Sequence, residues 1–136
     1  MTTYLLDTNH ASPLVTFGHP LRQRVLQQLD AGDSFAICVP MLTETLFGIG
    51  ILPRATQNRA EWARLQPSFP CYIPDETDAM LAADLQIALR RQGWQLTTID
   101  SLIAALALRY DLLLLATDRD FRVFPHLRYE NWLQTL

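Results

Sequence analysis

The most constraining feature of this sequence is a run of four leucines, Leu112 to Leu115, which Asp118 follows three residues later. The run is too short for a helix of its own and apolar at every position, which indicates a strand buried on both faces. Apolar residues also lead to Asp7 in TYLLD and recur in SFAICV at 34–39. Continuous apolar strands of this kind are typical of a parallel sheet that helices cover on both sides.

Helical patterns separate these strands. Residues 20–30 carry apolar side chains at helical spacing, and residues 75–93 begin with acids and end with arginines and a glycine, as the helix dipole favours. Residues 97–110 are apolar on most faces, which predicts a central helix. We therefore expect an α/β fold with a mainly parallel central sheet of about four to five short strands flanked by helices on both faces.

Length and composition narrow the class of protein. A chain of 136 residues with 49% hydrophobic residues can build one core, so we expect a single domain over residues 1–136. No apolar run approaches the roughly 18 residues of a membrane span, which predicts no membrane partner and a cytoplasmic location. Cys38 and Cys71 form no spaced motif and lie in apolar stretches, which predicts two buried thiols. A net charge of −3 argues against nucleic-acid binding by bulk positive charge.

Four acids take positions that a parallel sheet would bring together. Asp7 and Asp118 follow apolar strands, Glu44 lies one turn into the helix after SFAICV, and Asp100 lies at the start of the helix 97–110. In such sheets, ligands bind beyond the carboxyl ends of the strands. If the first and fourth strands are neighbours, all four carboxylates converge on one cleft.

Each acid taken alone also has a purely structural explanation. Asp7 and Asp118 fit as helix caps, Asp100 fits as a partner of Thr97 in a capping arrangement, and Glu44 fits as an exposed helix residue. Together, however, four carboxylates in one cleft repel one another unless a cation neutralises them. Carboxylates are hard oxygen ligands, so the expected cation is Mg2+ or Mn2+. Such a site suits phosphoryl chemistry with a metal-activated water.

Other kinds of active site are poorly supported. The three histidines share no spacing and are expected on the surface or in turns: His10, His19 and His126. The chain has neither a G-x-S-x-G motif nor a glycine-rich phosphate loop. An aspartyl-phosphate phosphatase or receiver-like module also places an acid after its first strand, but these families use a lysine near the phosphate and this chain has none.

Four segments resemble a known family. YLLDTNH (4–10), TETLFGI (43–49), TTIDSLIAALAL (97–108) and LLLLATDRDF (112–121) are similar to the four acidic motifs of the PIN-domain nucleases, in the same order. The likeness is greatest to the VapC-type toxins of bacterial type II toxin-antitoxin pairs, and it covers essentially the whole chain.

The resemblance implies an endoribonuclease that requires Mg2+ or Mn2+, forms a homodimer and is inhibited by a cognate antitoxin lying across its active-site groove. The acids that match the catalytic and metal-binding positions are Asp7, Glu44, Asp100 and Asp118. The residues that match supporting positions are Thr8, Asn9, Thr117 and Asp120, the last acting through Arg119 or water. The chain departs from the family pattern at Thr45, where leucine is frequent, and at Ala116, where Ser or Thr is frequent.

Several alternatives stay open at this level. A PIN-fold nuclease of RNA processing outside a toxin-antitoxin pair, or a non-catalytic PIN-fold binding module, would share these motifs. Four arginines either edge the cleft or are scattered surface charge: Arg22, Arg24, Arg119 and Arg122. Four apolar residues form either a dimer or antitoxin surface or part of the core, and for Phe47 we favour the core. These residues are Phe47, Ile49, Ile51 and Leu52.

Overall fold

The computed structural model describes residues 1–133. The elements, with η marking a 3-10 helix, are β1 (Thr3–Leu6), α1 (Thr8–Ala11), η1 (Ser12–Val15), α2 (Pro20–Asp30), β2 (Ser34–Cys38), α3 (Val39–Gly50), α4 (Ala55–Leu65), η2 (Gln66–Ser68), β3 (Cys71–Tyr72), α5 (Glu76–Arg91), α6 (Thr98–Arg109), β4 (Leu113–Leu115), η3 (Arg119–Val123) and β5 (Tyr129–Glu130).

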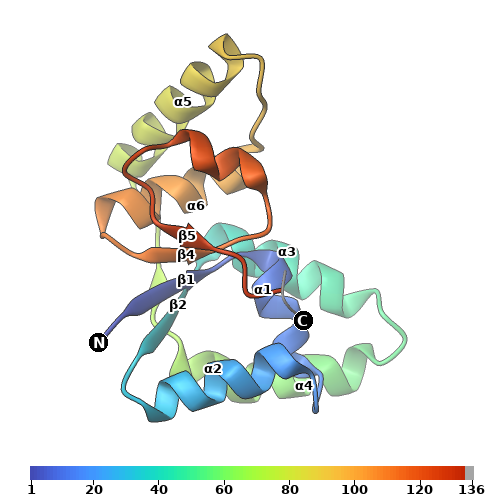
Figure 1. The fold of residues 1–136 in the computed structure, drawn as a ribbon. Helices are drawn as coiled ribbons and strands as arrows, with labels where there is room; N and C mark the ends of the chain where they lie inside the picture. Colours follow the sequence, from blue (N-terminus) through green and yellow to red (C-terminus); the bar gives the residue numbers. More distant parts are fainter. Residues whose placement is uncertain (134–136) are drawn as a thin grey trace.

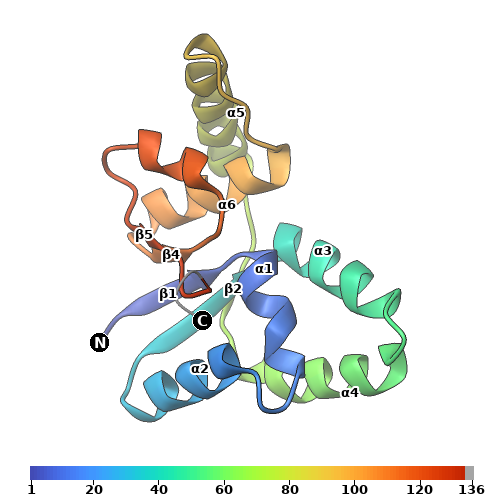
Figure 2. The same ribbon diagram turned by 45° about the vertical axis from the view of Figure 1, so that its right-hand side comes forward.

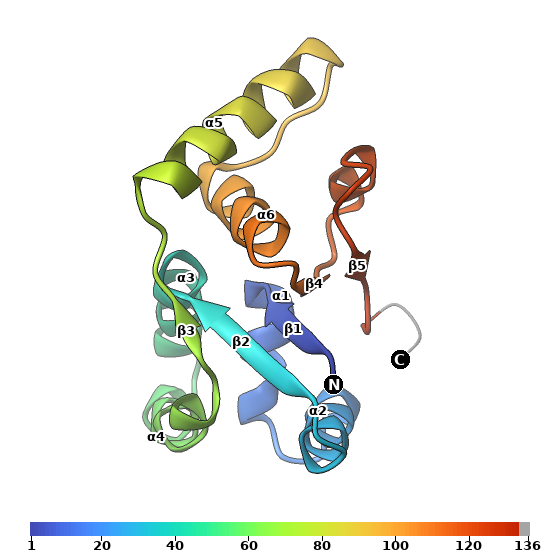
Figure 3. The ribbon, with the colours of Figure 1, turned by 90° about the vertical axis from the view of Figure 1, so that its left-hand side faces the viewer.

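The five described strands form one sheet in the order β3-β2-β1-β4-β5, and every neighbouring pair is parallel. Helices α2 and α4 lie on one side of this sheet, and α5 and α6 lie on the other (Figures 1 and 3). The predicted α/β architecture with a parallel central sheet and helices on both faces is therefore confirmed.

Strand β1 lies directly beside β4. Leu6 is paired with Leu115, and the N–H of Asp7 donates to the carbonyl of Leu115 at 3.0 Å. The first and fourth strands are thus neighbours, which was the condition for the four acids to converge. Helix α3 contacts both α1 and α6 at the same end of the sheet (Figure 2).

The leucine-rich strands form the centre of the core. Leu5, Leu6, Leu114 and Leu115 are fully buried, and burying one leucine side chain stabilises a fold by about 2 kcal/mol. This burial confirms that the apolar runs are strands covered on both faces. The turns that leave β1 and β4 therefore follow directly from fully buried strands.

Helices α5 and α6 are joined by an ionic contact at one end. Arg109, in the last turn of α6, donates to Asp75 at 2.8 Å and to Asp78 at 3.1 Å, and these two acids form a capping box at the start of α5. The guanidinium of Arg109, together with the hydrogen bond from the Asp78 N–H, lowers the pKa of Asp75 to about 2. The contact joins the end of α6 to the start of α5.

Two predictions about buried side chains were wrong. Cys71 is exposed because it lies on the short edge strand β3, whereas Cys38 is buried and burial raises its thiol pKa to about 12. Phe47 is 68% exposed, because α3 buries the face that carries Thr45 and Ile49 and Phe47 points the other way. None of the helices within residues 1–133 combines the length and apolar character needed to cross a bilayer.

Candidate active site

Asp7 is the most firmly held of the predicted site residues. It is 6% exposed and caps α1. Its Oδ1 accepts from the N–H of His10 at 2.8 Å and from His10 Nδ1 at 2.9 Å, and its Oδ2 accepts from the N–H of Thr117 at 3.2 Å. Three N–H donors therefore fix the orientation of this carboxylate, which serves as a helix cap and as a site residue at once.

His10 was expected on the surface or in a turn, and that prediction was wrong. The side chain is completely buried, and its Nε2 accepts from the N–H of Trp132 at 3.1 Å. A ring nitrogen that accepts a hydrogen bond carries no proton, so in neutral His10 the proton is on Nδ1, which donates to Asp7. The contact spans 122 positions in the chain, and no local pattern around His10 indicates it.

The supporting residues link the motifs to one another. The hydroxyl of Thr8 donates to Glu44 Oε1 at 2.9 Å, and Asn9 Nδ2 donates to the hydroxyl of Thr117 at 2.8 Å. Ala116 has no hydroxyl, but Thr117, the next residue, has one, and this hydroxyl contacts Asn9 of the YLLDTNH motif. Thr8, Asn9 and Thr117 hold the segments after β1, β2 and β4 together.

Asp100 lies in the first turn of α6, where Thr97 caps the helix by accepting from the N–H of Asp100 at 3.1 Å. Burial raises the pKa of Asp100 to about 6. This value already includes the smaller raising effects of the negative charges of Asp118, Asp7 and Glu44 and the lowering effect of the Thr97 hydrogen bond. The four predicted acids are therefore close enough for their charges to interact.

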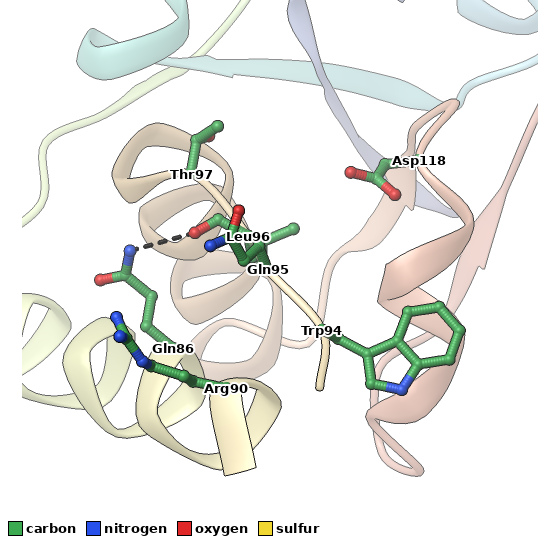
Figure 4. Close-up of a pocket in the computed structure, with 7 residues that line it drawn as sticks. All are labelled: Gln86, Arg90, Trp94, Gln95, Leu96, Thr97 and Asp118. Carbon is green, nitrogen blue, oxygen red and sulfur yellow. Dashed lines mark hydrogen bonds between the residues drawn. The ribbon is translucent and has the colours of Figure 1, made fainter. Parts of the chain in front are cut away.

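Two adjoining hollows contain these acids. Asp7, Glu44 and Asp100 line a cavity of about 210 Å³, together with Thr8, Asn9 and Thr97. Asp118 points into a neighbouring cavity of about 430 Å³, to which Thr97 also belongs (Figure 4). Within residues 1–133, no group of three or more Asp, Glu, His or Cys side chains has a conformation that could hold a metal ion without rearrangement.

Asp118 caps the short helix η3. Its Oδ1 accepts from the N–H of Asp120 at 2.8 Å. Asp120 therefore supports Asp118 through the main chain, and no ion pair joins its side chain to Arg119 in the described part of the chain.

Only two of the four candidate arginines lie beside the acids. Arg22 is buried and pairs with Glu61 at 2.9 Å, and the guanidinium of Arg24 lies 3.8 Å from the ring centroid of Trp132. Both make structural contacts, which favours for these two the alternative in which they do not edge the cleft. The arginines that lie next to Asp118 are those of η3, Arg119 and Arg122.

The geometry predicts the protonation of His10. Long-range 15N–1H NMR spectra should show His10 as the tautomer protonated at Nδ1, because Nε2 accepts from the backbone. His10→Ala should lower the free energy of unfolding in urea by roughly 2–3 kcal/mol, because it leaves buried partners unpaired. His19→Ala, which removes a less buried helix cap, should cost about 1 kcal/mol or less. A proton on Nε2 would contradict the arrangement.

The electrostatics of Asp100 predict how stability depends on pH. Because its pKa is raised from 3.8 to about 6 in the folded protein, the metal-free wild type should lose stability as the pH rises from about 4 to 6. Asp100→Asn lacks this loss and should be more stable at pH 8 by about 1 kcal/mol, a value discounted for solvent screening. Thermal unfolding in EDTA at several pH values measures the difference. The exposed control Asp84→Asn should follow the wild type, and a parallel decline in Asp100→Asn would contradict the assignment.

Comparison with solved structures finds the same fold in toxin-antitoxin complexes. VapBC2 from Rickettsia felis bound to a promoter DNA fragment matches with a TM-score of 0.83 and 21% identity, over 96% of this chain and 99% of that chain. DNA-bound VapBC from Salmonella typhimurium matches with a TM-score of 0.80 and 22% identity, over 97% and 99%. VapC20 from Mycobacterium tuberculosis, a Sarcin-Ricin loop cleaving toxin, matches with a TM-score of 0.67 and 16% identity, over 91% and 96%.

At these identities the matches establish the fold alone. No curated protein matches the sequence. The family model of the PIN domain, however, matches residues 4–127, which include all four predicted acids and nearly every element of the sheet. The chain therefore belongs to the PIN-domain family.

Proposed function

We propose that this protein is a metal-dependent endoribonuclease that acts as the toxin of a type II toxin-antitoxin pair. The observation that carries the proposal is the gathering of four carboxylates, in which burial and the other three charges raise the pKa of Asp100. Uncompensated charge of this kind destabilises a fold, and a bound divalent cation would offset it. The fold shared with VapBC complexes supports the toxin assignment.

The donor set fits Mg2+ or Mn2+, since it consists of carboxylate oxygens. Asp7, Asp100 and Asp118 would hold the ion, with Glu44 completing the set after a side-chain rotation for which its exposed position leaves room. When bound, the metal lowers the pKa of a water nucleophile and neutralises charge at the phosphorus centre.

The chain itself supplies positioning. Asp7 Oδ2 accepts a single N–H, from Thr117, which leaves a second lone pair for a ligand. His10 holds the other oxygen, and the hydroxyl of Thr8 orients Glu44. Asp7 is therefore oriented before substrate arrives, which reduces the reorganisation needed for in-line hydrolysis of an RNA phosphodiester. Arg119, exposed beside Asp118, provides a cation for the RNA backbone.

The partner surface in this proposal lies on α3. Phe47, Ile51 and Leu52 are 68%, 68% and 51% exposed, and a cavity of about 450 Å³ lies between α3 and Arg59 of α4. Exposed apolar groups that cluster in this way are typical of protein interfaces. Because Glu44 lies on the same helix, an antitoxin segment bound to this surface can extend over the acids. We place the antitoxin here and expect the protein to be a homodimer.

A cleavage assay tests the enzymatic part. Purified protein without antitoxin should cut RNA with Mg2+ or Mn2+ and lose this activity in EDTA. Asp7→Asn and Asp100→Asn should each lower the rate by roughly two orders of magnitude or more, because each removes charge stabilisation from the metal site. Asp84→Asn serves as the matched control and should keep full activity. Cleavage that persists in EDTA, or in both site variants, would exclude this mechanism, whereas no cleavage with either metal would favour a non-catalytic module.

Inhibition by the antitoxin tests the partner surface. We expect the product of a small reading frame next to the gene to bind the protein and inhibit its RNA cleavage. Phe47→Glu should cleave RNA normally but resist inhibition at least tenfold, because a charge is placed in an apolar contact. Ile87→Glu, which changes an exposed apolar residue on α5, should be inhibited like the wild type. Equal inhibition of both variants would place the antitoxin elsewhere, and the absence of any inhibitory neighbour would favour a role in RNA processing.

A further inference from the structure

We propose that the cavity beside Asp118 binds one unpaired nucleotide of the substrate, with its base stacked on Trp94. The inference rests on the proposed ribonuclease function, since it assigns a substrate position next to the same acids. It concerns RNA recognition rather than the chemical step.

The position of the cavity suits a nucleotide that neighbours the scissile bond. It lies between α5, the segment 94–97 and the start of η3 (Figure 4). Its volume of about 430 Å³ falls in the range of about 300–1,000 Å³ typical of small-ligand pockets. Thr97 lines both this cavity and the one formed by Asp7, Glu44 and Asp100, so the two cavities adjoin, as neighbouring nucleotide positions on one RNA chain require.

An aromatic side chain forms one wall. Trp94 is half-buried and lies on the η3 side of the cavity, with the guanidinium of Arg122 5.7 Å from its ring centroid. An indole held in this way is a platform for a base, because every base has a flat face that can stack. The cation of Arg122 adds attraction for the nucleotide's phosphate.

Polar groups line the opposite wall, on α5. Gln86 Nε2 donates to the carbonyl of Leu96 at 3.1 Å and to the Thr98 hydroxyl at 3.4 Å, which fixes its side chain and leaves Oε1 as an acceptor (Figure 4). Arg90, one turn further along α5, is exposed and forms no ion pair within residues 1–133. A fixed amide acceptor can read a base edge, and an unpaired guanidinium can bind a phosphate.

This lining favours a nucleotide over a peptide side chain from a protein partner. Among residues 1–133, Leu96 is the only apolar side chain in the wall apart from Trp94. A hydrophobic anchor would bury little apolar surface here, whereas an aromatic ring beside amides and guanidinium groups matches a base with its phosphate. The carboxylate of Asp118 repels phosphate, and Arg90 and Arg122 offset that repulsion from either side.

Tryptophan fluorescence provides a direct test. Trp62 and Trp132 are 1% and 2% exposed, so quenching by a bound base should report mainly on Trp94. The measurement uses the Asp7→Asn variant as the parent protein, because it should bind RNA without cutting it. Asp7 does not line the cavity, so this change leaves the proposed site intact. With Mg2+, a short single-stranded oligoribonucleotide should quench the emission and the same sequence in a duplex should not, because paired bases cannot stack on the indole.

Variants at Trp94 separate stacking from a loss of structure. By the anisotropy of labelled RNA, Trp94→Ala in the parent should bind roughly fivefold or more weakly, and Trp94→Phe should bind nearly as the parent because it keeps a ring. Phe17→Ala, which removes an exposed ring in a different cavity, should leave binding unchanged. Equal binding of Trp94→Ala and the parent, or quenching by an antitoxin peptide but not by RNA, would overturn the proposal.

A second readout uses the active protein. Trp94→Ala should still cleave with Mg2+ but should change which positions in a mixed-sequence RNA are cut, because base selection next to the acids is lost. Unchanged cut sites in Trp94→Ala would refute the nucleotide site while leaving the ribonuclease proposal intact. The converse outcome is a wild-type protein that does not cleave RNA but whose RNA binding depends on Trp94. That result would refute the ribonuclease proposal and leave the nucleotide-binding cavity intact.

Discussion

The parallel pairing of β1 with β4 is the contact on which the site depends. Leu6 lies opposite Leu115 in the buried centre of the sheet, and the N–H of Asp7 extends the pairing by one hydrogen bond. This register places the turns after both strands at one edge of the sheet. Helices α3 and α6 also contact each other. The acids are thus held by the most buried part of the molecule, which limits how far they can move apart.

The acid cluster costs stability, and the surrounding contacts offset part of that cost. Burial and three neighbouring charges raise the pKa of Asp100, so the ionised cluster is unfavourable near neutral pH. Asp7 is held in place by three N–H donors, two of them from His10, whose ring in turn accepts from the backbone N–H of Trp132. Buried, fully hydrogen-bonded networks of this kind are costly to disturb, and here the network ends at a residue proposed to bind metal.

Much of the fold, and the positions of the four acids on it, could be predicted because the signals are local, whereas the role of these acids in a metal site stays a prediction. A strand of consecutive leucines, an acid directly after it and a helix with acids first and arginines last can each be recognised within a few residues. The role of His10 could not be predicted, because it depends on Trp132, 122 positions away. The exposure of Phe47 depends on which face of α3 is turned toward the sheet. Arg22 is buried and forms an ion pair with Glu61 of α4, which is distant in the sequence. Long-range packing decides these cases, and it leaves no periodic pattern in the sequence.

The central claim is that these four carboxylates form one divalent-metal site. The most direct test is a crystal structure of the protein with Mn2+, using anomalous scattering to locate the ion. Such a site should give an anomalous peak within about 2.5 Å of oxygens from Asp7 and Asp100, with Asp118 or Glu44 as a further ligand. At saturating Mn2+, a peak bound only by other residues, or none at the carboxyl ends of β1 and β4, would contradict it.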